Sequence, residues 1–349
     1  MTTQTLMYQE ACSTPEKVAQ QLKQNMAIWH EIAQRLKQAP PPFCATVARG
    51  SSDHAASFAQ YLIETQLGWV TASQAPSVIT TYHSQLNWKG ALVIGISQSG
   101  KGPDLCQTFA AAKAAGALTV ALVNVEASPL AEIAEYVVPL HAGPEHAVAA
   151  TKSYITALSA LVQFMSIASD DQALAQALAQ LPDVLAQSLT MDWSIAVDEL
   201  AHAVNALVIG RGYGFPIAQE AALKFKETAV LHAEAFSSAE VLHGPFALMQ
   251  PDFPVLHFLQ QDASLTDSLA VTARMTELGA NTLLAVPEGL IADSTCAARH
   301  CLPLPSSVHP ILDPLMAIQA FYVMAEKLAC VRGYNPDQPQ NLKKVTETR

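Results

Sequence analysis

Hydrophobic residues gather in short runs that alternate with longer segments of mixed apolar and polar character. The short runs have the length of β-strands, whereas the longer segments have the spacing and the Ala, Leu, Lys and Glu content of helices. Because a helical crossover returns the chain to the same end of a sheet, this alternation predicts an α/β fold with a doubly wound parallel sheet. In the first half we expect strands at 45–48, 78–82, 92–96, 118–123 and 136–140, with helices near 53–65, 104–115 and 150–168.

The same pattern begins again in the second half of the chain. A strand at 206–210 leads through a Gly-rich turn into a helix that contains Glu227, as the first strand leads through Arg49-Gly50 into a helix. We therefore expect two tandem copies of one flavodoxin-like unit. Its later elements are predicted as strands at 255–259, 282–286 and 301–304 and a closing helix at 310–331.

These patterns also predict the domain boundaries. Within the first segment, Thr14 and Pro15 have the pattern of an N-cap and a first helical residue, so we expect a break in the helix there. The stretch that carries Glu234, Glu240 and His243 has an irregular pattern. The predicted parts are a helical arm at 1–42, a first α/β domain at 43–169, a helical connector at 170–195, a second α/β domain at 196–332 and an irregular tail at 333–349.

Composition narrows the classes of function. Half of the residues are hydrophobic and 14% are charged, so the chain can bury a large core. The net charge of −11 argues against nucleic acid or an anionic membrane as partner, although backbone amides can still bind a phosphorylated small molecule. The six cysteines have no C-x-x-C spacing, and the first residues lack a signal-peptide pattern. We therefore expect a cytoplasmic protein with reduced thiols and no metal site.

Two predicted strands end in loops rich in glycine and serine. They are Arg49-Gly50-Ser51-Ser52 and the stretch from Ser97 to Gly102, and each precedes a predicted helix. Glycine lets the backbone approach a ligand, hydroxyls donate to anionic oxygens, and a helix N-terminus favours negative charge. Ordinary helix capping is the alternative for one such loop. Two of them in one sheet favour anion binding, and the absence of G-K-[ST] argues against a Walker A motif.

The helix after the second Gly-rich turn carries a charged face. Glu220, Lys224 and Glu227 are spaced i, i+4 and i+7, which places two carboxylates and an ammonium on the same side. A surface ion pair is the alternative interpretation. The surrounding apolar and small residues favour the wall of a buried cleft. The preceding turn is G-x-G-x-G rather than G-x-G-x-x-G, so a dinucleotide site is poorly supported.

Taken in order, S-Q-S-G, A-T-K, E-A-A-L-K-F-K-E and L-H-G-P resemble the sugar isomerase (SIS) domain family. The arrangement is similar to the isomerase half of glucosamine-6-phosphate synthase, from about residue 43 to the tail. Thr2 stands where the glutaminase half of that enzyme has its nucleophilic cysteine, so we expect no ammonia from glutamine by that route.

The resemblance implies a role for individual residues. Glu227 matches the base that moves a proton between C1 and C2, and His243 matches a ring-opening histidine that reaches in from the partner subunit of a homodimer. Lys344 matches a lysine near the substrate carbonyl, with Lys343 as competitor because the register is one residue shorter. The remaining matches are Glu220 and Lys224 as supports of the base, Ser51, Ser52, Ser97, Gln98, Ser99 and Gly102 at the phosphate, and the backbone of Val148 and Ala149 along the sugar.

Three positions depart from the family pattern. Gly102 replaces a threonine that contacts phosphate, Lys101 replaces an acid, and Gln340 replaces an arginine of the tail. The resemblance implies a cofactor-independent glucosamine-6-phosphate deaminase that forms fructose 6-phosphate and ammonia. The alternative enzymes are another aldose–ketose isomerase, a galactosamine-6-phosphate deaminase and a fructosamine-6-phosphate deglycase. The alternative from another class is a non-catalytic sugar-phosphate sensor.

Overall fold

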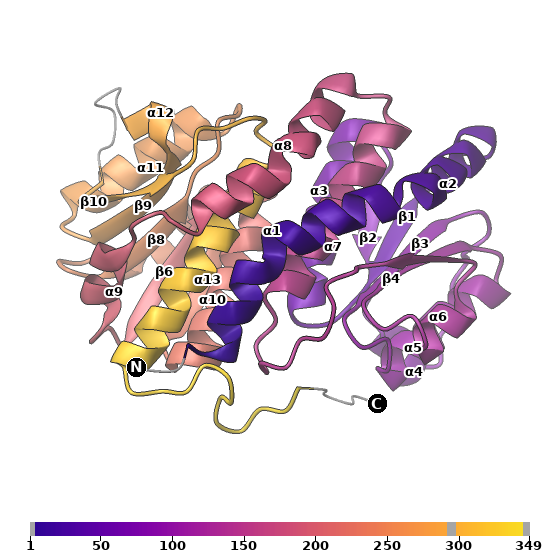
Figure 1. Ribbon diagram of the computed structural model, residues 1–349, viewed down its shortest axis with the longest axis horizontal. Helices are drawn as coiled ribbons and strands as arrows, with labels where there is room; N and C mark the ends of the chain where they lie inside the picture. Colours follow the sequence, from indigo (N-terminus) through magenta and orange to yellow (C-terminus); the bar gives the residue numbers. More distant parts are fainter. Residues whose placement is uncertain (1–3, 292–297, 345–349) are drawn as a thin grey trace. The chain divides into compact units, whose positions relative to one another are not determined.

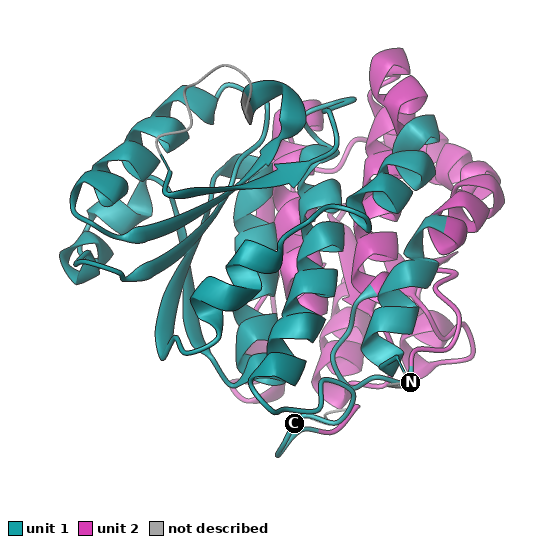
Figure 2. Cartoon of the chain, turned by 60° about the vertical axis from the view of Figure 1, so that its left-hand side comes forward, with its two compact units in different colours: residues 1–15, 146–151, 179–342 teal, residues 16–145, 152–178, 343–349 magenta. Residues whose placement is uncertain are grey.

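The computed structural model describes residues 4–291 and 298–344, and Figure 1 labels its helices and strands. The chain divides into two compact units, coloured in Figure 2. Unit 1 comprises residues 1–15, 146–151 and 179–342, and unit 2 comprises residues 16–145, 152–178 and 343–349. Each unit is built around one five-stranded sheet. The helices α1 (Leu6–Gln24) and α8 (Gln172–Ser188) contribute residues to both units.

The sheet of unit 2 is parallel throughout, with the strand order β2-β1-β3-β4-β5. The order reverses between β1 and β3, and such a reversal is where open α/β sheets bind ligands. Nearly every residue of β3 and β4 is buried, as expected for strands covered on both faces. The strands are β1 (Cys44–Val47), β2 (Thr71–Ser73), β3 (Leu92–Ser97), β4 (Leu118–Val123) and β5 (Tyr136–Pro139); the helices are α2 (Met26–Gln38), α3 (Ser51–Leu67), α4 (Ser77–Thr80), α5 (Pro103–Ala114), α6 (Pro129–Ile133) and α7 (Lys152–Ala168).

The sheet of unit 1 repeats this topology. Its order, β10-β9-β8-β6-β7, is the same as that of unit 2 when read from the other edge, and all pairs are parallel. The prediction of two tandem doubly wound units is thereby confirmed. The elements are β6 (Asn205–Gly210), β7 (His232–Ser237), β8 (Pro254–Phe258), β9 (Asn281–Pro287) and β10 (His300–Leu304), with α9 (Ser194–Leu200), α10 (Phe215–Ala229), α11 (Leu265–Glu277), α12 (Glu288–Ile291), α13 (Asp313–Val331) and the short 3₁₀ helices η1 (Gly212–Gly214), η2 (Glu240–Leu242) and η3 (Pro245–Leu248).

The predicted break in the N-terminal arm is wrong. Helix α1 continues through Pro15, and the break comes at Asn25, between α1 and α2. A proline inside a helix has no N–H for the carbonyl four residues earlier, here Ala11. The side-chain amide of Gln319 donates to that carbonyl at 3.1 Å and satisfies it. A residue of α13 therefore supplies what the local sequence lacks.

Two further predictions of secondary structure are wrong. The β-branched run at 78–82 forms the short helix α4 and the turn after it, because Pro76 has αR geometry and its carbonyl accepts from Ile79 and Thr80 at 3.0 and 2.9 Å. The edge strand beside β1 is instead the three-residue β2. The segment with Glu234 is a regular edge strand, β7, which pairs along its whole length with β6.

Helix α13 is the core helix of unit 1. Among the described residues it alone is long and apolar enough to cross a membrane by those two criteria, with a mean hydropathy of 1.3. However, 78% of this stretch is buried within the structure. It packs against α10, where the rings of Phe321 and Phe225 meet edge to face with centroids 5.0 Å apart. The apolar composition of α13 is thus accounted for by packing inside the protein.

The prediction that the cysteines are reduced thiols holds only in part. Four of them are free thiols, namely Cys12, Cys44, Cys106 and Cys330. Cys301 is disulfide-bonded, which contradicts the prediction that all thiols are reduced. Cys296 lies outside the described residues.

Candidate functional site

In unit 2, both Gly- and Ser-rich loops lie at the carboxyl edge of the sheet. β1 and β3 are parallel neighbours, and the loops that follow them lead directly into α3 and α5. Helix α3 begins at Ser51 after Gly50, which has a φ of 57°, and no side chain caps its first turn. At this helix start, whose positive dipole end favours an anion, Ser51 and Ser52 are half-buried.

The loop after β3 is fixed by close packing. Gly100 has a φ of +64°, and a Cβ at this position would lie 2.2 Å from Ser128 Oγ, so only glycine fits. The N–H of Gly100 donates to Ser97 Oγ at 3.0 Å, and the N–H of Lys101 donates to Ser99 Oγ at 3.4 Å. Since each hydroxyl accepts from the backbone, its own proton can be donated to a ligand. Gln98 is half-buried between them.

A buried carboxylate joins the two loops. Arg49 donates through Nε and Nη2 to Oδ2 of Asp104 at 3.0 and 2.9 Å. Asp104 is 2% exposed and sits in the first turn of α5, whereas the side chain of Arg49 is 55% exposed. The ion pair therefore fixes the end of β1 against the start of α5 while the guanidinium still faces water. Together with the helix N-termini, it makes this edge suitable for an anion.

The tail lysine of unit 2 is also paired with a buried carboxylate. Lys344 Nζ lies 2.9 Å from Glu145 Oε2, and the Glu145 side chain is fully buried. Glu145 also accepts from the N–H and the hydroxyl of Ser153, at 3.2 and 2.8 Å, in the first turn of α7. Lys343 is exposed. Of the two lysines that compete in the sequence, the structure places Lys344 on a fixed carboxylate.

In unit 1, the charged face of α10 is gathered in the interior. Glu220 and Lys224 are 0% and 1% exposed, and the side chain of Glu227 is 21% exposed. Lys224 Nζ lies 3.3 Å from Glu220 Oε1 and also pairs with Glu227 Oε2, and the Tyr322 hydroxyl donates to Glu220 at 3.1 Å. This burial rules out the alternative of a surface ion pair. Glu227 is the member of the group that a ligand can reach.

The two carboxylates of this group determine the protonation state of Lys224. Burial lowers the pKa of the ammonium, but the carboxylates of Glu220 and Glu227 raise it by more, so the pKa of Lys224 is above its usual value. The lysine is therefore charged at neutral pH. The ammonium lies between two carboxylates, of which Glu227 is the more exposed.

The remaining candidate residues of the sequence analysis lie outside regular helices and strands. His243 is exposed in the turn between η2 and η3, and its N–H donates to the Glu240 carbonyl at 2.9 Å. Ala149 is 1% exposed, and Val148 is half-buried in unit 1. Gly102 directly precedes α5, and Lys101 is exposed. The contribution of His243 to a partner subunit stays a prediction.

Sequence reasoning missed Asp104 and Glu145. The one available signal for Asp104 was its place right after Pro103 at the start of a predicted helix, where an acid is common. Glu145 gave no such signal, because its partner Lys344 is 199 residues away. Among the described residues, no group of three or more His, Cys, Asp or Glu side chains could hold a metal ion.

Comparison with known proteins shows clear similarities. The glutamine–fructose-6-phosphate aminotransferase (isomerizing) of Zymomonas mobilis is 31% identical over 311 residues, which are 85% of this chain and 51% of that protein. The chain thus spans about half the length of such curated relatives. A candidate phosphosugar isomerase from Silicibacter pomeroyi has a similar structure, with a TM-score of 0.88, 38% identity and coverage of 96% and 100% of the two chains.

A second solved structure is the C-terminal domain of glucosamine-fructose-6-phosphate aminotransferase from Francisella tularensis. It matches with a TM-score of 0.87 and 25% identity over 97% of this chain and 99% of that one. The SIS domain family itself matches at residues 44–167 and 199–329, which contain both sheets completely. Since these two matches cover most of the chain, the protein belongs to the SIS domain family and carries two copies of the domain.

Proposed function

We propose that the protein is an isomerising glucosamine-6-phosphate deaminase. The observation that carries this proposal is the α10 group, in which the buried Lys224 stands between Glu220 and the accessible Glu227. The isomerizing aminotransferases that resemble the chain support a phosphorylated hexose as substrate class. The exposed guanidinium of Arg49 and the hydroxyls of Ser51, Ser52, Ser97 and Ser99 suit its phosphate group.

The proposed reaction begins with opening of the sugar ring, which His243 of a partner subunit would assist. Glu227 takes the proton from C2 of the open aldehyde while the carbonyl oxygen O1 takes up a proton, which gives an enolamine. The proton then returns to C1 as the amino nitrogen loses one. The product is an imine at C2. Water adds to this imine and expels ammonia, which leaves fructose 6-phosphate. Lys224 pairs with Glu227 Oε2 and holds the carboxylate in place for the first step.

The direct test is a product assay on the purified protein. Glucosamine 6-phosphate is supplied without glutamine, and ammonia and fructose 6-phosphate are measured in the same samples. We expect equal amounts of the two products. If fructose 6-phosphate is converted to another hexose phosphate and no ammonia appears with any amino sugar, the protein is a plain aldose–ketose isomerase. Binding of sugar phosphate without any turnover would instead support the non-catalytic sensor.

The tail lysines give a matched pair of variants. Lys344→Ala removes the ammonium that Glu145 holds, and we expect kcat to fall about 10- to 100-fold because a group placed near the substrate carbonyl is lost. Lys343→Ala changes an exposed side chain of the same length and charge, so we expect kcat to stay within about twofold. Steady-state kinetics on both variants make this check. Equal losses, or a larger loss at Lys343, would reassign the lysine.

A further inference from the structure

The start of α1 is capped by a side chain from the C-terminal tail. The N–H groups of Leu6 and Met7 each donate to a carboxylate oxygen of Asp337, both at 2.8 Å, across more than 300 residues of sequence. These are two of the N–H groups that a helix cannot pair internally. Thr5 Oγ1 accepts from Tyr8 N at 3.2 Å, so the local cap is present as well. Asp337 therefore adds a second, nonlocal cap that fixes the tail to α1.

The segment at 146–148 is held by the same two parts of unit 1. The N–H groups of His146 and Ala147 donate to the carboxylate of Glu10, which lies one turn further along α1 and is 6% exposed. The N–H of Val148 donates to the backbone carbonyl of Asp337 at 3.1 Å. Three consecutive N–H groups are thus used by α1 and the tail. We call this arrangement, with Asp337, Glu10 and their N–H donors, the Asp337 clasp.

The clasp decides what the segment can offer to a ligand. Each residue has one backbone donor and one backbone acceptor. Because the donors of residues 146–148 are occupied, this backbone can offer only carbonyl oxygens, which accept from hydroxyl or ammonium groups. An amino sugar carries both kinds of donor. The chemistry of this segment therefore depends on how firmly α1 and the tail hold it.

We propose that Asp337 is a positioning residue for the reaction. It would not touch the substrate, but it ties the backbone at Val148 and the tail that leads to Lys344 to one helix start. This inference rests on the proposed function, because the segment and Lys344 act on the sugar only if that proposal holds. Its geometric part is that the Asp337 carboxylate fixes the tail, and with it the carbonyl that accepts from Val148, to the start of α1. This part can be measured without any substrate.

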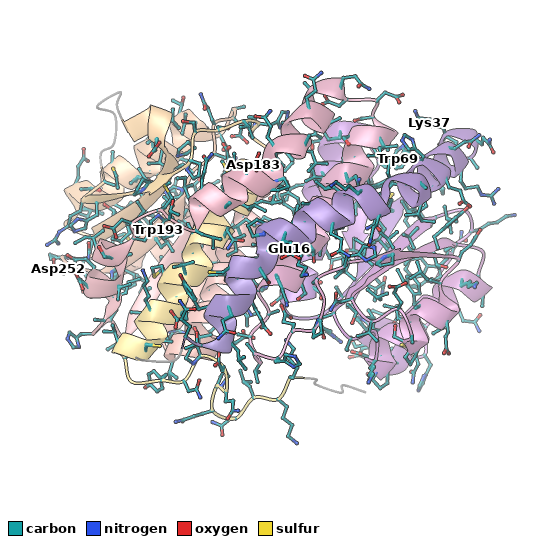
Figure 3. All side chains as sticks on the ribbon, viewed as in Figure 1. Glu16, Lys37, Trp69, Asp183, Trp193 and Asp252 are labelled. Carbon is teal, nitrogen blue, oxygen red and sulfur yellow. The ribbon has the colours of Figure 1, made fainter. Side chains whose placement is uncertain are left out.

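The geometric part is tested by amide hydrogen exchange on Asp337→Ala and Asp337→Asn. In Asp337→Ala we expect the amides of Leu6 and Met7 to exchange about 10- to 100-fold faster, since both lose a charged acceptor. The Val148 amide keeps its acceptor, the backbone carbonyl of residue 337, and we expect a smaller increase there because the tail is no longer fixed to α1. Asparagine keeps one acceptor oxygen and should give a smaller increase. Asp252→Asn is the control, because its carboxyl is 80% exposed at the surface, as labelled in Figure 3. Unchanged exchange in Asp337→Ala would overturn the clasp, whether or not the wild type turns out to be a deaminase.

Kinetics then separate positioning from simple loss of folded protein. We expect Asp337→Ala to raise the KM for glucosamine 6-phosphate about tenfold, while the inhibition constant of inorganic phosphate stays within about twofold, since the serine loops are untouched. A variant that only unfolds in part would lower kcat and leave KM unchanged. That pattern would reject the positioning role. A wild type without ammonia release would reject the proposed function alone, and the exchange result would still decide the clasp.

Discussion

Glu227→Gln is expected to abolish ammonia release, with kcat reduced about 100- to 10,000-fold. Glutamine has nearly the size of glutamate and can still accept from Lys224, so the helix and its buried pair keep their geometry. It cannot accept a proton from C2. The loss should therefore appear in the proton-transfer step and not in the affinity for the sugar phosphate.

This expectation is checked with glucosamine 6-phosphate that carries deuterium at C2. The wild type should release the deuterium to water or transfer it to C1, whereas the variant should retain it at C2. Glu277→Gln is the matched control, because Glu277 is exposed at the end of α11 in the same unit. A Glu227→Gln variant that keeps more than about a tenth of the wild-type rate would show that another group is the base.

Lys224→Met is expected to destabilise the fold by about 3–5 kcal/mol. Methionine fills most of the volume of lysine but leaves the Glu220 carboxylate buried without its cation, and Glu220 is fully buried. Replacing both members, as Lys224→Met with Glu220→Gln, removes the uncompensated charge and should recover a large part of the loss. Urea denaturation of the single and double variants measures both effects.

The pH dependence of this loss has a definite sign. The pKa of Lys224 in the folded protein lies above the ordinary value of 10.5, so folding binds this proton more tightly. The stabilisation is fully present below pH 10.5 and is lost only as the pH rises through the higher pKa of the folded state. The contribution of the lysine's own titration to the difference between wild type and Lys224→Met should therefore be constant from about pH 6 to 9.

A surface lysine provides the control for this stability effect. Lys37 pairs with Asp170, and the two side chains are 51% and 76% exposed; Lys37 is labelled in Figure 3. Because exposed pairs contribute little, Lys37→Met should cost less than about 1 kcal/mol. A Lys224→Met variant as stable as Lys37→Met would contradict the view that the α10 group is an interdependent buried network.

The α/β architecture was predictable because it follows from periodicity. Each central strand is covered on both faces and reads as an apolar run, as in β3 and β4. Some helices begin at a Gly-rich turn or a proline, as α3 does after Gly50 and α5 does at Pro103. The edge strands were the weak point, since β2 has three residues and β7 carries exposed polar side chains. Such strands are defined by their neighbour rather than by their own pattern.

The chemically important groups also divide into those that the sequence predicts and those that it does not. The α10 group could be foreseen from spacing alone, because Glu220, Lys224 and Glu227 lie on one helix and its geometry fixes their face. The serine loops could be foreseen from strand ends and glycines. No local pattern, however, shows which acid a distant cation or amide will meet. Asp104, Glu145, Glu10 and Asp337 belong to this second class.

The sequence by itself determined the two parallel units, the charged face of α10 and the hydroxyl loops, since each of these follows from a pattern of neighbouring residues in the chain. Only the tertiary structure decided that α1 passes through Pro15, because the Ala11 carbonyl is satisfied by Gln319 of α13. It also decided that Lys344 is held by Glu145 and that Asp337 caps α1. These bonds join residues separated by 199 and 331 positions, and nothing in the spacing of a chain records which distant groups its folding brings together.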